Sequence, residues 1–67
     1  MKNKWVKIRS FEKFYLAEII KGYLIENNIP AIVLNKKDTI LLHHSGQVEL
    51  YVEKNFRSKA LEILKDR

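Results

Sequence analysis

Few side chains of this sequence could take part in chemistry, and two adjacent histidines stand out among them. His43 and His44 are the only histidines in the 67 residues, and there is no cysteine. Adjacent residues on a strand point to opposite faces, so this pair is poorly arranged to chelate one metal ion. Asp38 is the nearest carboxylate, and Glu49 could approach across a hairpin. Metal or small-ligand sensing, or a pH response, at residues 36–46 therefore stays open beside a simple surface pair.

The serines and carboxylates do not form a catalytic pattern. A serine nucleophile needs a base within hydrogen-bonding reach and a third group that orients the base. None of the three serines has such a context (Ser10, Ser45 and Ser58). Glu49 and Glu53 share a strand face but lie about 13 Å apart along the strand, too far for acid–base work on one bond. With only two glycines there is no phosphate-binding loop, so we expect no enzymatic activity and no cofactor.

Size and composition limit what the chain can be. Hydrophobic residues make up 46% and charged residues 31%, a globular composition that suits one domain over residues 1–67. Without a disulfide or thiolate metal site, a small core must hold the fold alone or be helped by a second copy, which favours a homodimer. No apolar run approaches the ~20 residues of a membrane span. The N-terminal residues do not resemble a signal peptide, so we expect a cytoplasmic protein without membrane contact.

Three segments have the pattern of β-strands. Residues 5–10 alternate apolar and basic side chains, which indicates a strand with one buried face. Residues 29–35 are apolar on both faces, and Pro30 places their strand at an edge or marks its start. The alternation is clearest in residues 47–53. There the apolar face consists of Val48, Leu50 and Val52.

Two segments are typical of helices. The first runs from about residue 11 to residue 28, with Ser10 as its N-cap and Asn27 and Asn28 at its C-terminal end. Gly22 lies inside this helix at a cost of about 1 kcal/mol relative to alanine, and close approach of another backbone would explain it. The second helix runs from about residue 55 to residue 66. The first helix has more apolar residues than one sheet can cover, the surplus being Phe14, Tyr15, Ile19 and Ile25.

The order β-α-β-β-α predicts an α+β fold with two helices on one face of an antiparallel sheet. A right-handed crossover through the first helix leaves room for the third strand between the other two, which gives the strand order 1-3-2. This is a ferredoxin-like fold without its fourth strand. Because the missing strand would pair with the first, residues 5–10 should form an exposed edge.

The sheet face opposite the helices is the candidate interaction surface. Its expected members are Trp5, Lys7, Arg9, Ile32, Leu34, Glu49 and Tyr51, with Ala31 and Val33 as the alternative pair from the second strand. Aromatic and basic side chains on a sheet are typical of single-stranded nucleic-acid binding, and the net charge of +5 is compatible with it. Glu49 and Glu53 would repel phosphates, however, and could instead pair with Lys7 and Arg9. We therefore expect a protein partner, or burial by residues 40–42 or a second subunit.

Several short segments together resemble a known family. They are Trp5-Val6, residues 17–24, residues 26–31, Gly46 with residues 48–52, and residues 60–64. In this order they resemble the small prokaryotic signal-transducing protein family, a bacterial domain of unknown function with a ferredoxin-like, PII-like fold. A common form of the family has glycine where this chain has Asn28, a residue that suits the same backbone conformation. The resemblance implies a regulatory module and carries over no catalytic or ligand-binding residue.

Overall fold

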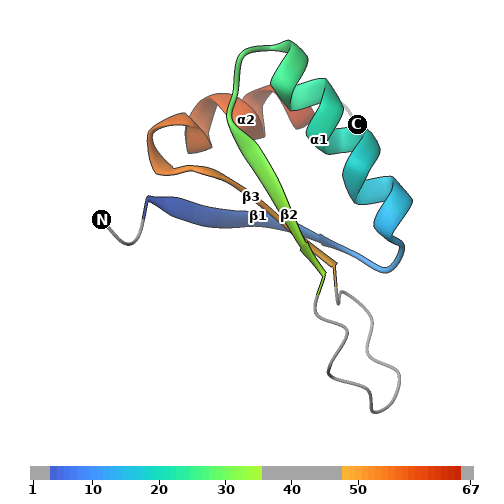
Figure 1. Ribbon diagram of the computed structural model, residues 1–67. Helices are drawn as coiled ribbons and strands as arrows, with labels where there is room; N and C mark the ends of the chain where they lie inside the picture. The colour runs from blue at the N-terminus through green and yellow to red at the C-terminus, as the bar shows by residue number, and fades with distance from the viewer. Residues whose placement is uncertain (1–3, 36–47, 66–67) are drawn as a thin grey trace.

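The computed structural model describes residues 4–35 and 48–65, which form a three-stranded sheet and two α-helices (Figure 1). The strands are β1 (Trp5–Phe11), β2 (Ala31–Asn35) and β3 (Val48–Glu53). The helices are α1 (Phe14–Glu26) and α2 (Arg57–Leu64), with a 3-10 turn, η1 (Lys54–Phe56), leading into α2. Both outer strands are antiparallel to β3, and the sheet order is β1-β3-β2. The predicted α+β, ferredoxin-like arrangement is confirmed.

Strand β3 is the centre of the sheet because it pairs with β1 along one edge and with β2 along the other. Its apolar residues are almost completely removed from water: Val48 is 3% exposed, and Leu50 and Val52 are 0% exposed. Strict alternation put these three side chains on one face, which is the face that the helices cover. The strand predicted with the clearest pattern is therefore also the best buried.

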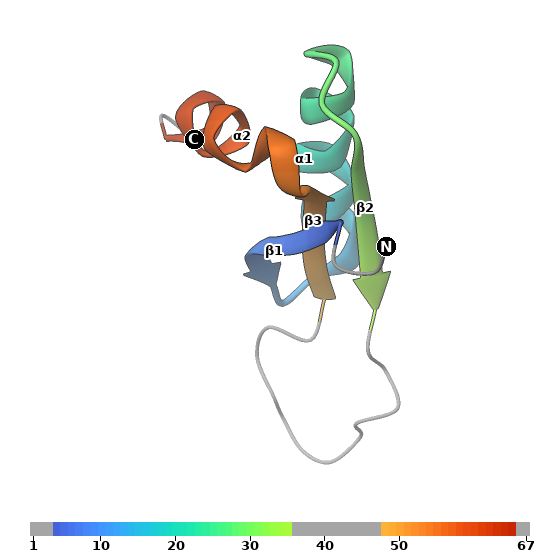
Figure 2. The same ribbon diagram turned by 90° about the vertical axis from the view of Figure 1, so that its left-hand side faces the viewer.

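Both helices lie on one side of the sheet and close a single core against β3 (Figures 1 and 2). Helix α1 buries Ala17 and Leu24, and α2 buries Ala60 and Leu64. An alanine in each helix keeps the side-chain layer thin, so the helices can pack closely on the strands. The buried cluster consists of Leu24, Ile29, Ala31, Leu50, Val52, Ala60 and Leu64.

The first helix begins later than the sequence pattern indicates. Residues Ser10 and Phe11 continue β1, and α1 starts at Phe14 with Lys13 as its N-cap and no side-chain cap. The prediction of Ser10 as a helix cap is therefore wrong. The reason is tertiary: Phe11 pairs with Val48 and packs against the core, and both contacts favour continuation of the strand.

The end of α1 is a Schellman motif built on an asparagine. Asn28 has a φ of 64°, the left-handed conformation that glycine usually supplies at this position. The N–H of Ile29 donates to the carbonyl of Leu24 over 3.0 Å, and the N–H of Asn28 donates to the carbonyl of Ile25 over 2.9 Å. Leu24 and Ile29 both belong to the core cluster, so this turn directs the backbone from α1 across the core to the start of β2.

The outward side of α1 is rich in apolar residues, as expected from the sequence. Tyr15 is 59% and Ile19 is 62% exposed, and Phe14 and Ile25 are about half exposed. Gly22 lies on this helix, and a Cβ added to it would meet nothing within 4 Å. Close approach of another backbone therefore does not explain Gly22 within the described part of the chain.

Truncating the central core residue should unfold much of the population. We expect Leu50→Ala to lower the free energy of unfolding by about 2–5 kcal/mol, because it removes buried methyl groups and leaves a cavity at a side chain that is 0% exposed. The control Leu61→Ala, at a leucine that is 38% exposed on α2, should cost about 1 kcal/mol or less. Urea denaturation followed by far-UV circular dichroism measures both. Equal losses in the two variants would contradict the central position of β3.

The left-handed residue at the end of α1 allows a second test. Asn28→Ala should destabilise the protein by about 1 kcal/mol, because alanine lacks the carboxamide that makes the left-handed conformation at a φ of 64° tolerable for asparagine, whereas Asn28→Gly should be at least as stable as the parent. The midpoints of thermal unfolding report the difference. If alanine and glycine gave the same stability, the residue would not be in this conformation in solution.

Candidate functional site: the outer face of the sheet

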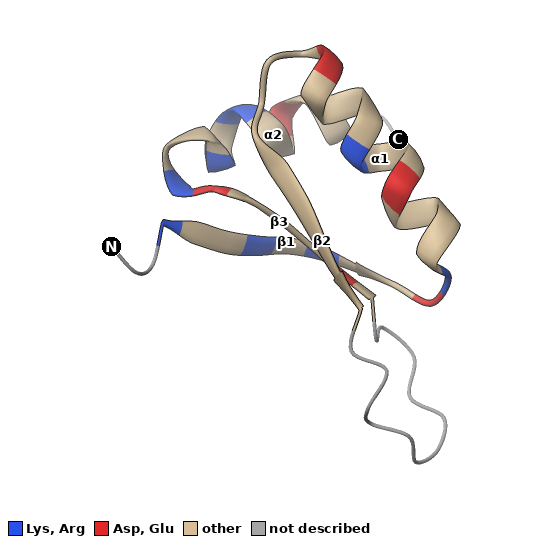
Figure 3. Cartoon of the chain, viewed as in Figure 1, with Lys and Arg blue, Asp and Glu red and all other residues tan. Residues whose placement is uncertain are grey.

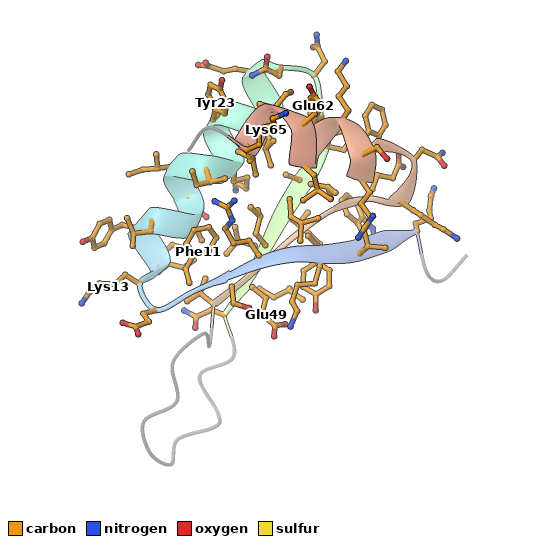
Figure 4. All side chains as sticks on the ribbon, turned by 180° about the vertical axis from the view of Figure 1, so that it is seen from behind. Phe11, Lys13, Tyr23, Glu49, Glu62 and Lys65 are labelled. Atoms are coloured by element: carbon orange, nitrogen blue, oxygen red, sulfur yellow. The ribbon has the colours of Figure 1, made fainter. Side chains whose placement is uncertain are left out.

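The candidate site is the face of the sheet turned away from α1 and α2, which we call the outer face. In the antiparallel register Ile32 lies opposite Tyr51, and Leu34 lies opposite Glu49. Figure 4 shows Glu49 on the side of the strands away from both helices. Directly opposite residues share a face, so Ile32 and Leu34 belong to the outer face. The alternative pair, Ala31 and Val33, packs with the core.

Strand β1 contributes Trp5 and Lys7 to the outer face, but not Arg9. Lys7 pairs with Tyr51, whereas Arg9 pairs with Leu50, so the register shifts by one residue at Ile8. Such a β-bulge reverses the side-chain alternation beyond it. Arg9 consequently shares the core-side face of Leu50 and is half-buried. The expectation that Arg9 joins the outer face is wrong, because a period-2 pattern contains no sign of an inserted residue.

A small polar network lies at the middle of the outer face. Tyr51 Oη donates a hydrogen bond to Glu49 Oε1 over 2.9 Å, and Lys7 Nζ donates to Glu49 Oε2 over 3.4 Å. Glu49 is only 9% exposed, and a carboxylate that has lost this much water must be compensated by donors and a cation. The predicted ion pair between Lys7 and Glu49 is confirmed.

A second ion pair lies at the end of the sheet where β1 begins. Lys4 Nζ is 3.6 Å from Glu53 Oε2, and Trp5 pairs with Glu53 across the sheet. Basic residues occur along β1 and acidic residues along β3 (Figure 3). Lys4 and Lys7 are therefore each paired with a carboxylate of β3.

The network changes the acid–base behaviour of Tyr51. The hydrogen bond to Glu49 raises the pKa of Tyr51 above 10.0, and burial and the charge of Glu49 act in the same direction. A phenol that acts as a base or nucleophile needs its pKa lowered. The environment of Tyr51 therefore keeps the hydroxyl protonated as a donor to Glu49, which is a structural arrangement.

The other candidate residues lie outside the described part of the chain. These candidates are His43 and His44, with the ligand or metal site expected at residues 36–46. The expected cover of the sheet, residues 40–42, also lies outside the described part. Among residues 4–35 and 48–65, no three histidine, cysteine or carboxylate side chains are grouped so as to hold a metal ion. No described helix is long and apolar enough to cross a membrane.

One feature near the outer face has no counterpart in the sequence analysis. Trp5 forms a pocket of about 330 Å³ with residues of the α1–β2 junction, which are Ile25, Asn28, Ile29, Pro30 and Ala31. The two parts of this pocket are far apart in the sequence. The exposed Ile25 at the end of α1 was the one available signal, because it had no place in the core.

Comparison with known proteins gives no match to support a function. No family model fits the sequence, and no curated protein or solved structure is significantly similar to it. The resemblance to the signal-transducing family therefore depends on its residues alone.

The link between Glu49 and Tyr51 can be tested by titration. Glu49→Gln should lower the pKa of Tyr51 towards 10.0, because it removes the anionic acceptor that stabilises the protonated phenol. Phenolate absorbance is measured against pH for the parent and for Glu49→Gln. From each curve the curve of the same protein carrying Tyr51→Phe is subtracted, which leaves the titration of Tyr51 without the other two tyrosines. An unchanged midpoint would contradict the hydrogen bond.

The same shift gives stability a pH dependence. The folded pKa of Tyr51 lies above the unfolded value, so its contribution to stability is complete below pH 10 and is lost as the pH rises through the folded pKa. The free energy of unfolding should therefore fall more steeply above pH 10 in the parent than in Tyr51→Phe.

Proposed function

We propose that this chain is a non-enzymatic interaction module with a regulatory or signal-transducing role, which acts through its outer face and the adjoining edge of β1. The observation that supports this most is the set of large apolar side chains on a face that no described helix covers. Trp5 is 39% and Leu34 is 46% exposed, and Ile32 and Tyr51 are half-buried between them. Apolar residues that span every strand of a sheet and meet water are typical of a contact surface.

A second copy of the chain is the partner that the charges favour. Each copy has a formal net charge of +5, so two copies repel each other over most approaches. The outer face differs, because its cations Lys4 and Lys7 are balanced by Glu53 and Glu49. A two-fold interface brings one patch against itself and must be self-complementary. A balanced, partly apolar face satisfies this condition, and we therefore propose a homodimer.

The small size of the chain supports the same conclusion. A domain of 67 residues buries only about 60% of the surface that its unfolded chain exposes. Covering the outer face would remove Trp5, Leu34 and Tyr51 from water and add to a limited core. The edge of β1 has a lesser part in this proposal, because the bulge at Ile8 interrupts its backbone ladder.

Association can be tested with one charged substitution and a matched control. Sedimentation equilibrium should show a monomer–dimer equilibrium for the parent, and Leu34→Lys should raise the dissociation constant by about tenfold or more, equivalent to about 1.4 kcal/mol. Leu61→Lys makes the same change at a similarly exposed leucine on α2 and should leave the constant unchanged.

Two results would count against this proposal. The first is a parent protein that stays monomeric at millimolar concentration while Trp5 fluoresces like free indole in water. The second is an equal effect of Leu34→Lys and Leu61→Lys, which would indicate repulsion by added charge instead of loss of a specific contact.

A further inference from the structure

The pocket beside Trp5 is separate from the apolar centre of the outer face. It has a volume of about 330 Å³ and lies where the start of β1 approaches the α1–β2 junction. It is an open depression, and its lining consists of Trp5, Ile25, Asn28, Ile29, Pro30 and Ala31. A volume of this size is at the lower end of the range of small-molecule sites, about 300–1,000 Å³.

The part of the lining formed by the junction is held in place before any ligand arrives. The Schellman hydrogen bonds fix residues 27–29, and the pyrrolidine ring restricts the backbone at Pro30. Ile29 and Ala31 are anchored in the core at 1% and 9% exposure. In β1, the pairing of Trp5 with Glu53 fixes the backbone that carries the indole. A preformed site loses little entropy when a ligand binds.

The lining selects for an uncharged ring. None of the lining side chains is charged, and Lys4, which precedes Trp5 in the sequence, is paired with Glu53. The indole of Trp5 offers an aromatic face for stacking, and Pro30 and Ile25 offer aliphatic contact. The lining also contains the exposed carboxamide of Asn28, which can donate or accept a hydrogen bond, whereas the indole N–H of Trp5 can only donate one.

From these features we infer that the pocket is a binding site for a small, uncharged molecule with one aromatic ring and one polar substituent. The ring stacks on Trp5 and contacts Pro30, while the polar group bonds the carboxamide of Asn28. This site goes beyond the proposed association, because most of its residues lie outside the outer face. Trp5 belongs to both the pocket and the outer face, so a ligand in the pocket would contact a residue at the edge of the contact surface.

Phenol is a suitable probe, and nuclear magnetic resonance can locate it. Trp5 is the only tryptophan, so its indole N–H gives a single, unambiguous signal. Phenol should shift this signal and the amide signals of Ile25, Asn28 and Ile29 saturably, with a Kd on the order of 1–10 mM for so small a ligand. Benzoate, which carries a charge, should bind at least about tenfold more weakly than phenol. Shifts that fail to saturate, or that spread evenly over the surface, would overturn the site.

Variants on α1 supply the matched test. Ile25→Glu places a charge in the lining and should weaken phenol binding by about tenfold or more, whereas Ile19→Glu should not change it. Both isoleucines are exposed, at 49% and 62%, so neither substitution removes a buried contact. Equal phenol affinity in the two variants would contradict the assignment.

Two further variants separate the polar contact and the proposed function. Asn28→Gly keeps the backbone conformation and should weaken phenol several-fold without affecting toluene; equal losses for both probes would remove Asn28 from the site. Leu34→Lys should retain phenol binding even where it abolishes association. The pocket and the homodimer can therefore fail independently.

Discussion

The alternation of apolar and polar residues along β3 is the constraint on which every other described element depends. Leu50 and Val52 pack in the core with residues of both helices, and Val48 is buried on the same face, while the backbone of β3 pairs with β1 and β2. Removing those side chains from water stabilises the fold through the hydrophobic effect. Since both neighbouring strands pair with β3 and not with each other, losing it would leave neither a sheet nor a surface for the helices to cover.

The same alternation creates a harder problem on the outer face. Glu49 lies on the outer face of the central strand, where residues of β1 and β2 flank it on both sides, and its carboxylate is largely removed from water. Lys7 and Tyr51 supply a cation and a hydroxyl from neighbouring positions, which offsets much of the desolvation cost. The result is a fixed polar centre with Leu34 and Trp5 on its flanks. Rigid aromatic and aliphatic groups around a satisfied polar core are typical of protein contact surfaces.

The sequence predicts most of this fold because its strongest signals are local. The period of two in residues 47–53 predicted the strand β3, the right-handed crossover predicted its central position, and Asn28 was expected at the left-handed end of α1. It also predicted the pair between Lys7 and Glu49. Two features were missed for physical reasons. The bulge at Ile8 changes which face Arg9 occupies without changing any residue type, and Phe11 was taken into the strand by tertiary packing against propensity.

The pocket was missed for a different reason. Trp5 and Pro30 are far apart in the sequence, and neither has a pattern that indicates the other. Their approach depends on the Schellman turn and on the strand order together. The surplus of apolar residues on α1 indicated that its outward side could contact something. It did not indicate that Ile25 would lie beside Trp5.

The strand order has a consequence for the chain as it leaves the ribosome. Trp5–Phe11 and Ala31–Asn35 are made first, yet they meet only through Val48–Glu53, which is made last of the strands. Until then the nascent chain holds two unpaired strands and an amphipathic helix with no surface to cover, a state that exposes apolar residues to aggregation. Cooperative structure should therefore form late in synthesis, once the segment through Glu53 has emerged.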